Sequence, residues 1–326
     1  MSLLVIGLFL VFALGCIKEE VPTVSTTEIT NVTMSSAISG GYVEDDGGMG
    51  IIDCGICWST NDNPTIADNK TIDTLGAFGF ESSITGLEAN TTYYVRAYAT
   101  NSVGTGYGNV ISFKTSGFST FTDPRDGNVY KTIQIGNQIW MAENLKYLPS
   151  VVGYETGSVT YPYYYVYGYN GTNISDAKAT ENYATYGVLY NWSAVMGGAM
   201  NSNNNPSGVR GVCPEGWHVP SEAEWTQLTD FLGGVNLAGG KLKETGTTHW
   251  NSPNTGATNE TGFTALPGGG YYGVNFSSIG SYGYWWSATA SDNNNAWSRN
   301  LDYYASAIFR DYDIKFLGIS IRCVRD

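Results

Sequence analysis

Few side chains in this sequence suit acid–base or metal chemistry. Its 326 residues include only two histidines, His218 and His249, and His249 has no cysteine or histidine neighbour. Zinc sites take about four ligands, and general bases are most often histidines. The sequence therefore offers few residues for a zinc site or for a general base. A glycosidase needs two carboxylates facing each other across a cleft, and no spacing in the sequence indicates such a pair. The residue types therefore favour binding over catalysis.

The pair Cys54-Gly-Ile-Cys57 invites a redox or zinc interpretation. A thioredoxin-type pair would open a helix, whereas this one lies inside a strand pattern that continues into Trp58. Residues three apart in a regular strand point to opposite faces, so a disulfide would need a bulge. We predict that both cysteines pack within a strand, with a strained disulfide and a metal or redox site as the alternatives.

Oxygen ligands of the kind that calcium binds occur in two loop stretches. The first holds Asn251, Asn259 and Glu260, and the second holds Asp292 ahead of three asparagines. These four residues are the candidate calcium ligands. We expect no other cofactor.

Residues 160–170, TYPYYYVYGYN, form the most unusual stretch of the chain. Positions 161, 163, 165, 167 and 169 are all tyrosine, so in an extended strand five phenol rings would line one face. Such rings suit stacking on sugars or on protein surfaces, but a sheet can equally bury them against the core. Both interpretations stay open. The candidate ligand-binding residues are Tyr163, Tyr165, Tyr167, Trp250, Asn251, Trp285, Trp286 and Trp297.

One helix is expected to be packed on the core. Ser221 and Glu224 have the S-x-x-E spacing of a capping box, in which each side chain bonds the backbone N–H of the other residue. Apolar residues then recur at helical spacing at Trp225, Leu228 and Leu232. The pattern predicts a helix with one buried face.

A second helix is predicted over residues 186–196, which repeat apolar residues at helical spacing and end at two glycines. From residue 233 onward, glycine, asparagine and threonine dominate. That composition predicts long loops, where binding sites are often found.

Short alternating strands between glycine and asparagine turns fill residues 22–116, which is typical of a β-sandwich. Residues 129–135 and 138–141 flank a Gly-Asn turn and predict a β-hairpin. Residues 117–120 are the expected hinge between the two regions. The predicted fold class is mainly β, with an α+β C-terminal domain that has two main helices.

Four blocks of the C-terminal region resemble one family. They are residues 123–145, 186–192 and 321–325 and the run 213–225, CPEGWHVPSEAEW. This ordered set is similar to the Fibrobacter succinogenes major paralogous domain (FISUMP), which is found in many copies in bacterial envelope proteins. The resemblance spans residues 121–326. The family as such implies no established activity.

More distantly, residues 216–225 are similar to a run of the sulfatase-modifying (formylglycine-generating) family, whose fold is of C-type-lectin type. This resemblance implies a C-type-lectin-like C-terminal domain. Those enzymes need a reactive cysteine pair near the C-terminal part of the domain, where this chain offers Cys323 alone. The catalytic branch therefore does not carry over, and we expect the chain not to be an enzyme.

Cys213 and Cys323 are the only cysteines of that region. An even pair in an exported domain most simply forms a disulfide. It would enclose about 110 residues, for which the chain-entropy model gives ~4–5 kcal/mol of stability.

Within residues 22–116, the pattern Leu87-x-x-x-Thr91-x-Tyr93, followed by residues 95–99, resembles the E–F corner and F strand of a fibronectin type III domain. This resemblance implies a fibronectin-III-like β-sandwich that serves as a spacer.

The N-terminal stretch predicts export and lipid anchoring. Residues 1–15 are almost entirely apolar and shorter than the ~20 residues that span a bilayer, so they are expected to be a signal peptide. Residues 13–16, Ala-Leu-Gly-Cys, resemble a lipobox, which implies lipidation of Cys16 and a tether over residues 16–21. Residues 18–20, Lys-Glu-Glu, are similar to the tag that exports lipoproteins to the outer surface in the Bacteroidetes. An uncleaved or misassigned start is the alternative.

Composition fits an exported binding protein. The chain has 29 acidic and 16 basic residues, and its net charge of -13 repels nucleic acid. We predict a lipoprotein of the bacterial outer membrane that is exposed on the surface, touches the membrane only through its lipid, and binds polysaccharide or mediates adhesion. The alternatives are a structural or protein-interaction component that binds another envelope protein, and a divergent enzyme of sulfatase-modifying type.

Overall fold

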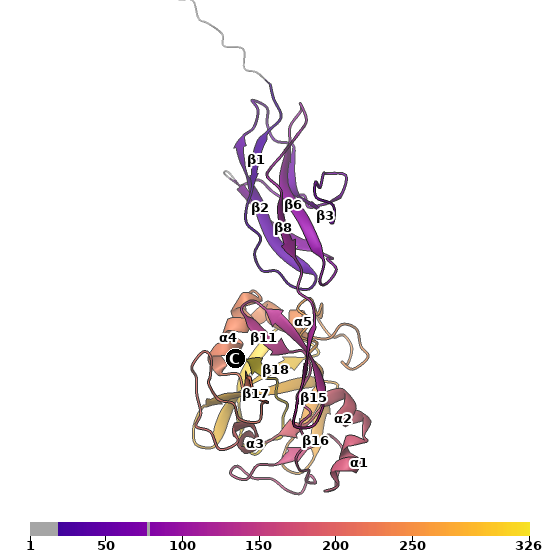
Figure 1. Ribbon diagram of the computed structural model, residues 1–326, viewed down its shortest axis with the longest axis vertical. Coiled ribbons are helices and arrows are strands. Elements are labelled where there is room, and N and C mark those ends of the chain that lie inside the picture. Colours follow the sequence, from indigo (N-terminus) through magenta and orange to yellow (C-terminus); the bar gives the residue numbers. More distant parts are fainter. Residues whose placement is uncertain (1–18, 77–78) are drawn as a thin grey trace, which may run out of the picture. The chain divides into compact units, whose positions relative to one another are not determined.

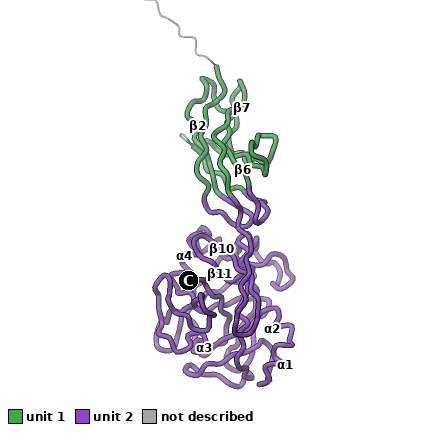
Figure 2. Tube along the Cα trace, in the orientation of Figure 1, with its two compact units in different colours: residues 1–29, 38–84, 93–113 green, residues 30–37, 85–92, 114–326 purple. Residues whose placement is uncertain are grey.

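The computed structural model describes residues 19–76 and 79–326. The expected signal peptide and the lipobox with Cys16 lie outside the described residues. The chain divides into two compact units, which Figure 2 distinguishes by colour. The first consists of Met1–Ile29, Ile38–Ile84 and Tyr93–Phe113, and the second of Thr30–Ala37, Thr85–Thr92 and Lys114–Asp326. In the described part of the chain, no helix has the length and apolar character needed to cross a membrane.

The first unit is built on a β-sandwich (Figure 1). One sheet has the order β1 (Thr23–Thr26), β2 (Ser36–Asp45) and β5 (Gly79–Thr85). The other has the order β4 (Asn69–Lys70), β3 (Asp53–Ser59), β6 (Thr92–Thr100) and β7 (Thr105–Tyr107), and β8 (Ile111–Lys114) pairs with β6. This division of the strands is that of a fibronectin-III-like sandwich, as predicted.

Cys54 and Cys57 both lie in β3 and are buried free thiols. Their sulfurs contact the backbone oxygens of Asp73 and Arg96, each at 3.5 Å. Burial raises the pKa of both thiols, which is the opposite of what a reactive thiolate requires. The strand-packing prediction is therefore confirmed. The disulfide alternative is wrong, because both thiols are free. No metal-binding cluster is found among the described residues.

The second unit is mainly β and holds four sheets. The largest has the order β14 (Trp217–His218), β20 (Val324–Arg325), β11 (Gln138–Met141), β10 (Val129–Ile135) and β9 (Ser119–Thr122). The others are β12 (Tyr164–Tyr165) with β13 (Leu189–Tyr190), β15 (Gly268–Tyr271) with β16 (Phe276–Ile279), and β17 (Tyr282–Ala290), β18 (Asn295–Asp302) and β19 (Ile308–Ile314) in that order. The predicted β10–β11 hairpin is confirmed, with Ile135 opposite Gln138. Ser119 and Thr120, expected in the hinge, instead belong to β9.

The helices of this unit are short. They are α1 (Ile174–Lys178), α2 (Glu181–Tyr186), α3 (Trp192–Met196), α4 (Glu222–Phe231) and α5 (Val235–Leu242). Both halves of the capping box that starts α4 are formed by Ser221 and Glu224, and Trp225 and Leu228 are buried. The main predicted helix is therefore confirmed.

The helix predicted over residues 186–196 is wrong in its first half. There, Leu189 and Tyr190 form β13, and the Tyr190 N–H donates to the Ile319 oxygen at 2.8 Å. Tyr186 is the last residue of α2. The rest of the range is helical only in α3, which begins after Asn191, whose side-chain oxygen accepts from the Ala194 N–H. Pairing with neighbouring strands outweighs the helical periodicity here.

The second long helix, α5, lies where the composition predicted loops. Its interior contains Gly239 and Gly240, residues that weaken isolated helices. A Cβ at either glycine would lie 2.2 Å from a backbone oxygen, that of Ala307 or Gly256. Close packing therefore requires the glycines that hide this helix in the sequence.

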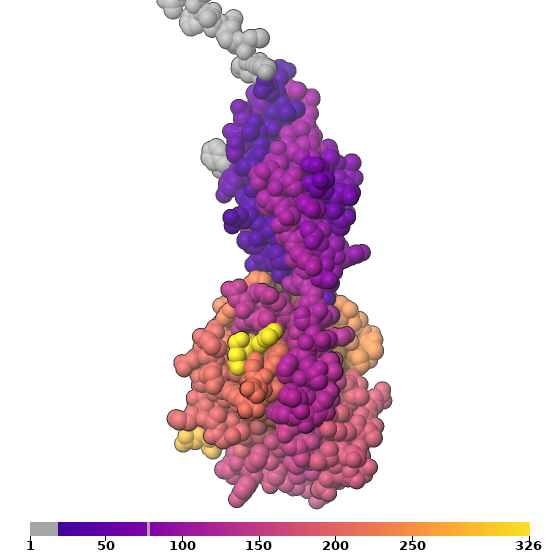
Figure 3. All heavy atoms as spheres, in the orientation of Figure 1, coloured from indigo at the N-terminus to yellow at the C-terminus, as the bar shows by residue number. Residues whose placement is uncertain are grey.

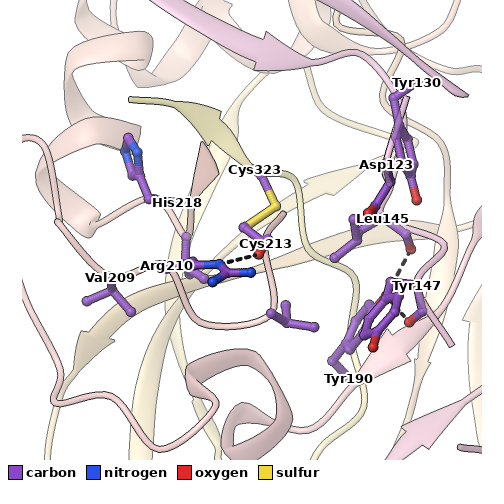
Figure 4. The surroundings of a disulfide bond; sticks show 12 residues. Asp123, Tyr130, Leu145, Tyr147, Tyr190, Val209, Arg210, Cys213, His218 and Cys323 are labelled. Atoms are coloured by element: carbon purple, nitrogen blue, oxygen red, sulfur yellow. Dashed lines mark hydrogen bonds between the residues drawn. A yellow bond between two sulfur atoms is a disulfide. The ribbon is translucent and has the colours of Figure 1, made fainter. Parts of the chain in front are cut away.

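The predicted disulfide between Cys213 and Cys323 is present, with a Cα–Cα distance of 6.0 Å. It lies inside one of the two large buried clusters of the unit, together with Trp217 and Tyr190. Figure 4 shows the bridge joining the loop that precedes β14 to the segment that enters β20. The last strand is thereby fixed covalently to the entry of the main helix.

Candidate ligand-binding surface

The tyrosine stretch does not form one long strand. Only Tyr164 and Tyr165 are extended in β12, and the chain then turns, because the Tyr169 N–H donates to the Val166 oxygen and Gly168 adopts a φ of 74°. The five alternate tyrosines therefore do not share a face. Tyr165 is fully buried, whereas Tyr161 is 69% exposed.

Three of the predicted stacking tryptophans lie in the core. Trp250, Trp285 and Trp286 are at most 1% exposed. Each indole N–H donates inside the protein at 2.8–2.9 Å, to the Ala265 oxygen, the Asn144 side chain and the Tyr190 oxygen respectively. Like Tyr165, they stabilise the fold and cannot reach an external ligand. For these four residues the ligand-binding prediction is wrong.

Trp297 is partly exposed, but other side chains of the protein already contact its ring. The Arg310 guanidinium lies 3.6 Å from the ring centroid, and the Tyr312 ring meets it edge-on at 5.8 Å. Trp297 is therefore one member of a Trp–Arg–Tyr cluster on β18 and β19 rather than an open platform.

The structure instead gathers aromatic side chains on both sides of the β15–β16 hairpin. Figure 1 labels the two strands of this hairpin. On one side, Tyr271 stacks on Tyr165 at 4.2 Å, and Phe276 lies 5.2 Å from Tyr167. On the other side, Tyr272 lies 6.3 Å from Tyr284, which stacks on Tyr282 at 5.6 Å. Tyr163 packs against the buried cluster that contains Tyr271. We call the partly exposed members of this set the tyrosine belt: Tyr163, Tyr167, Tyr272, Phe276, Tyr282 and Tyr284.

Asn191 positions the first side of the belt. Its side-chain amide donates to the oxygens of Ser158 and Tyr161, each at 2.7 Å, and its side-chain oxygen accepts from the Tyr163 N–H at 2.9 Å. One buried residue thus fixes the backbone that carries Tyr163.

The sequence signal for the other side of the belt is the alternating run Tyr282-Gly-Tyr284, which the sequence prediction did not include.

The candidate calcium ligands are not brought together. Asn251 donates to Ser281, Asn259 accepts from the Thr264 N–H, and Glu260 pairs with Lys241 at 3.1 Å. In the second loop, Asp292 accepts from the backbone N–H groups of residues 294 and 295. Each of the four thus bonds to a neighbouring group of the protein.

Lysine ammonium groups hold the carbonyls of both loops. Lys243 is fully buried, and its Nζ donates to the oxygens of Thr255, Asp302 and Ala305 at 2.8–3.0 Å. Lys315 donates to the oxygens of Asp292 and Asn293. Burial lowers the pKa of both lysines, that of Lys243 to about 8. In both loops, backbone carbonyls are therefore bonded by a lysine ammonium group.

His218 lies between two carboxylates. Its Nδ1 is 2.7 Å from Asp326 Oδ1, and its Nε2 is 2.7 Å from Glu224 Oε1. Burial by itself would lower the pKa of His218, but the bonds and charges of Glu224 and Asp326 outweigh it and raise the pKa. His218 thereby links α4 to the end of the chain, a structural role.

A pocket of about 380 Å³ opens beside this histidine, between Arg210, Trp217 and Asp326. In Figure 3 the yellow atoms of the chain's end are open to solvent on this side. Both ring nitrogens of His218 are bonded, so neither is free to act on a bound molecule.

We expect His218 to make the protein less stable as the pH rises. Because its folded pKa lies above the ordinary value of 6.5, its stabilisation is complete below about pH 6.5 and is lost as the pH rises through the folded pKa. His218→Gln should remove this slope, which urea unfolding from pH 5 to 9 would measure. His249→Gln, at a half-exposed histidine, is the control that keeps the slope. An unchanged slope in His218→Gln would disprove the assignment.

The family model described as the Fibrobacter succinogenes major domain matches residues 133–325, more than half of the chain. The chain belongs to this family. The matched residues include the disulfide, α4 and the whole tyrosine belt, and stop just before Asp326. The first unit lies outside them.

Two solved structures that are similar to this chain each cover about a third of it. One is the sensor domain of the anti-sigma factor RsgI4 of Pseudobacteroides cellulosolvens, at 17% identity and a TM-score of 0.23, which covers 29% of this chain and 95% of that one. Another is the third fibronectin III domain of the human KIAA0343 protein, at 16% identity and a TM-score of 0.22, which covers 33% and 93%. Among curated proteins, none matches. Likenesses this low carry no argument about function.

Proposed function

We propose that this member of the Fibrobacter succinogenes major domain family is a non-catalytic lipoprotein of the outer cell surface that binds a glycan on the tyrosine belt of its second unit. The observation that supports the proposal most directly is the partial exposure of six aromatic rings around one hairpin. Aromatic rings with polar tips can stack on a sugar ring while the hydroxyl bonds to water or to the sugar.

The hairpin that carries part of the tyrosine belt is fixed by a buried residue and is exposed to solvent at its tip. Tyr271 is fully buried, and its hydroxyl donates to the Gly273 oxygen at 2.9 Å, so the hairpin is held from inside. Its tip carries Val274, which is 75% exposed. A rigid mount for exposed rings reduces the entropy lost on binding. The net charge of -13 favours a neutral glycan over an anionic one.

The proposal of binding without chemistry is supported by how the ionisable groups are used. His218 is bonded at both ring nitrogens, and His249 bonds Glu244 at 2.8 Å. Cys213 and Cys323 are joined to each other, so the reactive pair of the formylglycine-generating enzymes has no counterpart at these positions. Anchoring through Cys16 and exposure at the cell surface belong to the same proposal.

A second candidate function is the binding of another envelope protein. The cluster of Trp297, Arg310 and Tyr312 favours it, because these three residue types dominate the energetics of protein interfaces.

The test is a glycan array and a pull-down on insoluble neutral polysaccharides with the purified protein, in calcium and in chelator. We expect saturable binding that chelator does not change, since lysines already hold the loop carbonyls. Tyr167→Ala should weaken binding about tenfold, the loss expected for one stacked ring.

The matched control is Tyr42→Ala, which removes an exposed tyrosine from β2 of the first unit and should leave binding unchanged. The glycan proposal fails if no glycan binds, or if the two tyrosine variants lose the same affinity. Loss of binding in chelator would point to a calcium site instead.

A further inference from the structure

Strand β19 has an unpaired outer edge. It is the last strand of the β17–β18–β19 sheet and pairs with β18 along its whole length, from Ile308 opposite Leu301 to Ile314 opposite Asn295. No other described residue bonds the backbone groups of residues 309–313. Backbone N–H and C=O groups left free along a strand edge are a template for another strand.

The side chains along this edge alternate in character. Arg310, Tyr312 and Ile314 share one face and are all exposed. Asp311 and Asp313 lie on the other face, where they accept hydrogen bonds from Asn300 and Ser298 of β18. The edge therefore offers Tyr312 and Ile314 beside Arg310 on one face, and two carboxylates beside the exposed Phe309 on the other.

Arg310 and Tyr312 are held in place before any partner arrives. The Arg310 guanidinium packs over Trp297, and its Nε lies 2.7 Å from Glu222 Oε1. The Tyr312 ring meets the Trp297 edge in the directly opposite register position. Preorganised Trp, Arg and Tyr side chains are the usual anchors of protein interfaces.

A second copy of this chain fits the edge poorly. When two copies of one strand edge pair antiparallel, a residue whose N–H and C=O point toward the partner strand must face another such residue. The two-fold axis of the pair therefore passes through one residue position, and that residue faces its own copy. Centring on Asp311 sets that carboxylate against its own copy, and centring on Tyr312 sets Asp311 against Asp313. Like charges directly opposite destabilise a strand pair.

We propose that the outer edge of β19 docks an extended segment of another protein in which basic residues alternate with apolar ones. Backbone hydrogen bonds would join the segment to residues 309–313. Its lysine or arginine side chains would face Asp311 and Asp313, and its apolar side chains would face Tyr312 and Ile314. The acidic residues share a face of this sheet with Tyr282 and Tyr284 of the tyrosine belt, which lie two strands away. The backbone edge of β19 is not part of the belt, so the inference does not depend on glycan binding.

The experiment uses the purified full chain and three synthetic nine-residue peptides. One alternates lysine and valine, one has the same composition with the lysines and valines in separate blocks, and one alternates glutamate and valine. Fluorescence anisotropy would measure affinity, and amide hydrogen exchange would locate the peptide. We expect the alternating basic peptide to bind at least about tenfold more tightly than the block peptide and to slow exchange within residues 309–313.

Two variants test the side-chain rows. Asp311→Lys and Tyr312→Ser should each weaken the alternating basic peptide about tenfold, while Tyr42→Ser, at an exposed tyrosine of β2, should not change it. Unfolding curves of each variant would confirm that it is folded. If a variant does not fold, amide hydrogen exchange of residues 309–313 in the wild-type protein still tests whether the peptide binds at the edge.

Three outcomes overturn the proposal. Equal binding of the alternating and block peptides would show mere attraction of cations to an acidic chain. Absence of slowed exchange at residues 309–313 would place the peptide elsewhere or nowhere. A dimer that forms without peptide and disappears in Asp311→Lys would assign the edge to a second copy.

Discussion

Replacing both Cys213 and Cys323 with alanine should lower the free energy of unfolding by about 4 kcal/mol. The bridge spans a sequence separation of 110 residues, so its loss gives the unfolded chain a large gain in conformational freedom. Both half-cystines are fully buried, and the bridge holds the last strand, β20, between β14 and β11 of the five-stranded sheet. Equilibrium denaturant unfolding would measure the change. The m-value should rise, because an unfolded chain without the bridge exposes more surface.

A reducing agent provides the control for this prediction. Reduction of the wild-type protein should bring its stability close to that of the double alanine variant, and should leave the variant itself unchanged. A second variant with Cys54 and Cys57 replaced by alanine should still respond to the reductant, because those thiols are free. The prediction is wrong if the Cys213 and Cys323 variant is as stable as wild type.

Local signals were enough to predict the elements whose hydrogen bonds are local. The capping box of Ser221 and Glu224 is satisfied within four residues of chain, and α4 forms where the box predicts it. The hairpin of β10 and β11 depends on a two-residue turn, with Gly136 at a φ of 58°. In both cases the residues that decide the structure are neighbours in the sequence.

Elements set by distant contacts could not be predicted in this way. Helix α5 contains Gly239 because the Ala307 oxygen approaches its backbone, and nothing near residue 239 announces that contact. The Tyr190 backbone bonds Ile319, far along the chain, and so leaves the predicted helix. Tertiary contacts overrode local propensity at both places.

The candidate site shows the same limit for side chains. Trp285 and Trp286 are adjacent in β17 and belong to different buried clusters, one with Trp225 and the other with Tyr190. Because neighbouring side chains of a strand point to opposite faces of the sheet, one of these two tryptophans would be exposed if one face met solvent. Both faces of β17 are covered by other parts of the protein, so both tryptophans are buried. A stacking residue therefore could not be told from a core residue by its type alone. The belt depends on which rings the β15–β16 hairpin meets, which only the fold decides.

Lys243→Met is expected to lower the free energy of unfolding by about 3 kcal/mol, because three buried carbonyls would lose their donor. Lys241→Met is the matched control, since its partly exposed pair with Glu260 should contribute at most about 1 kcal/mol. The pH dependence gives a second readout. With a folded pKa of about 8 against an ordinary 10.5, the unfolded chain holds more protons between these values, so wild-type stability gains a rising term there that Lys243→Met lacks. Urea unfolding would measure the free energy of unfolding of both methionine variants. An equal decrease in the two would show that the bonds from the buried Lys243 ammonium to the loop carbonyls do not stabilise the fold.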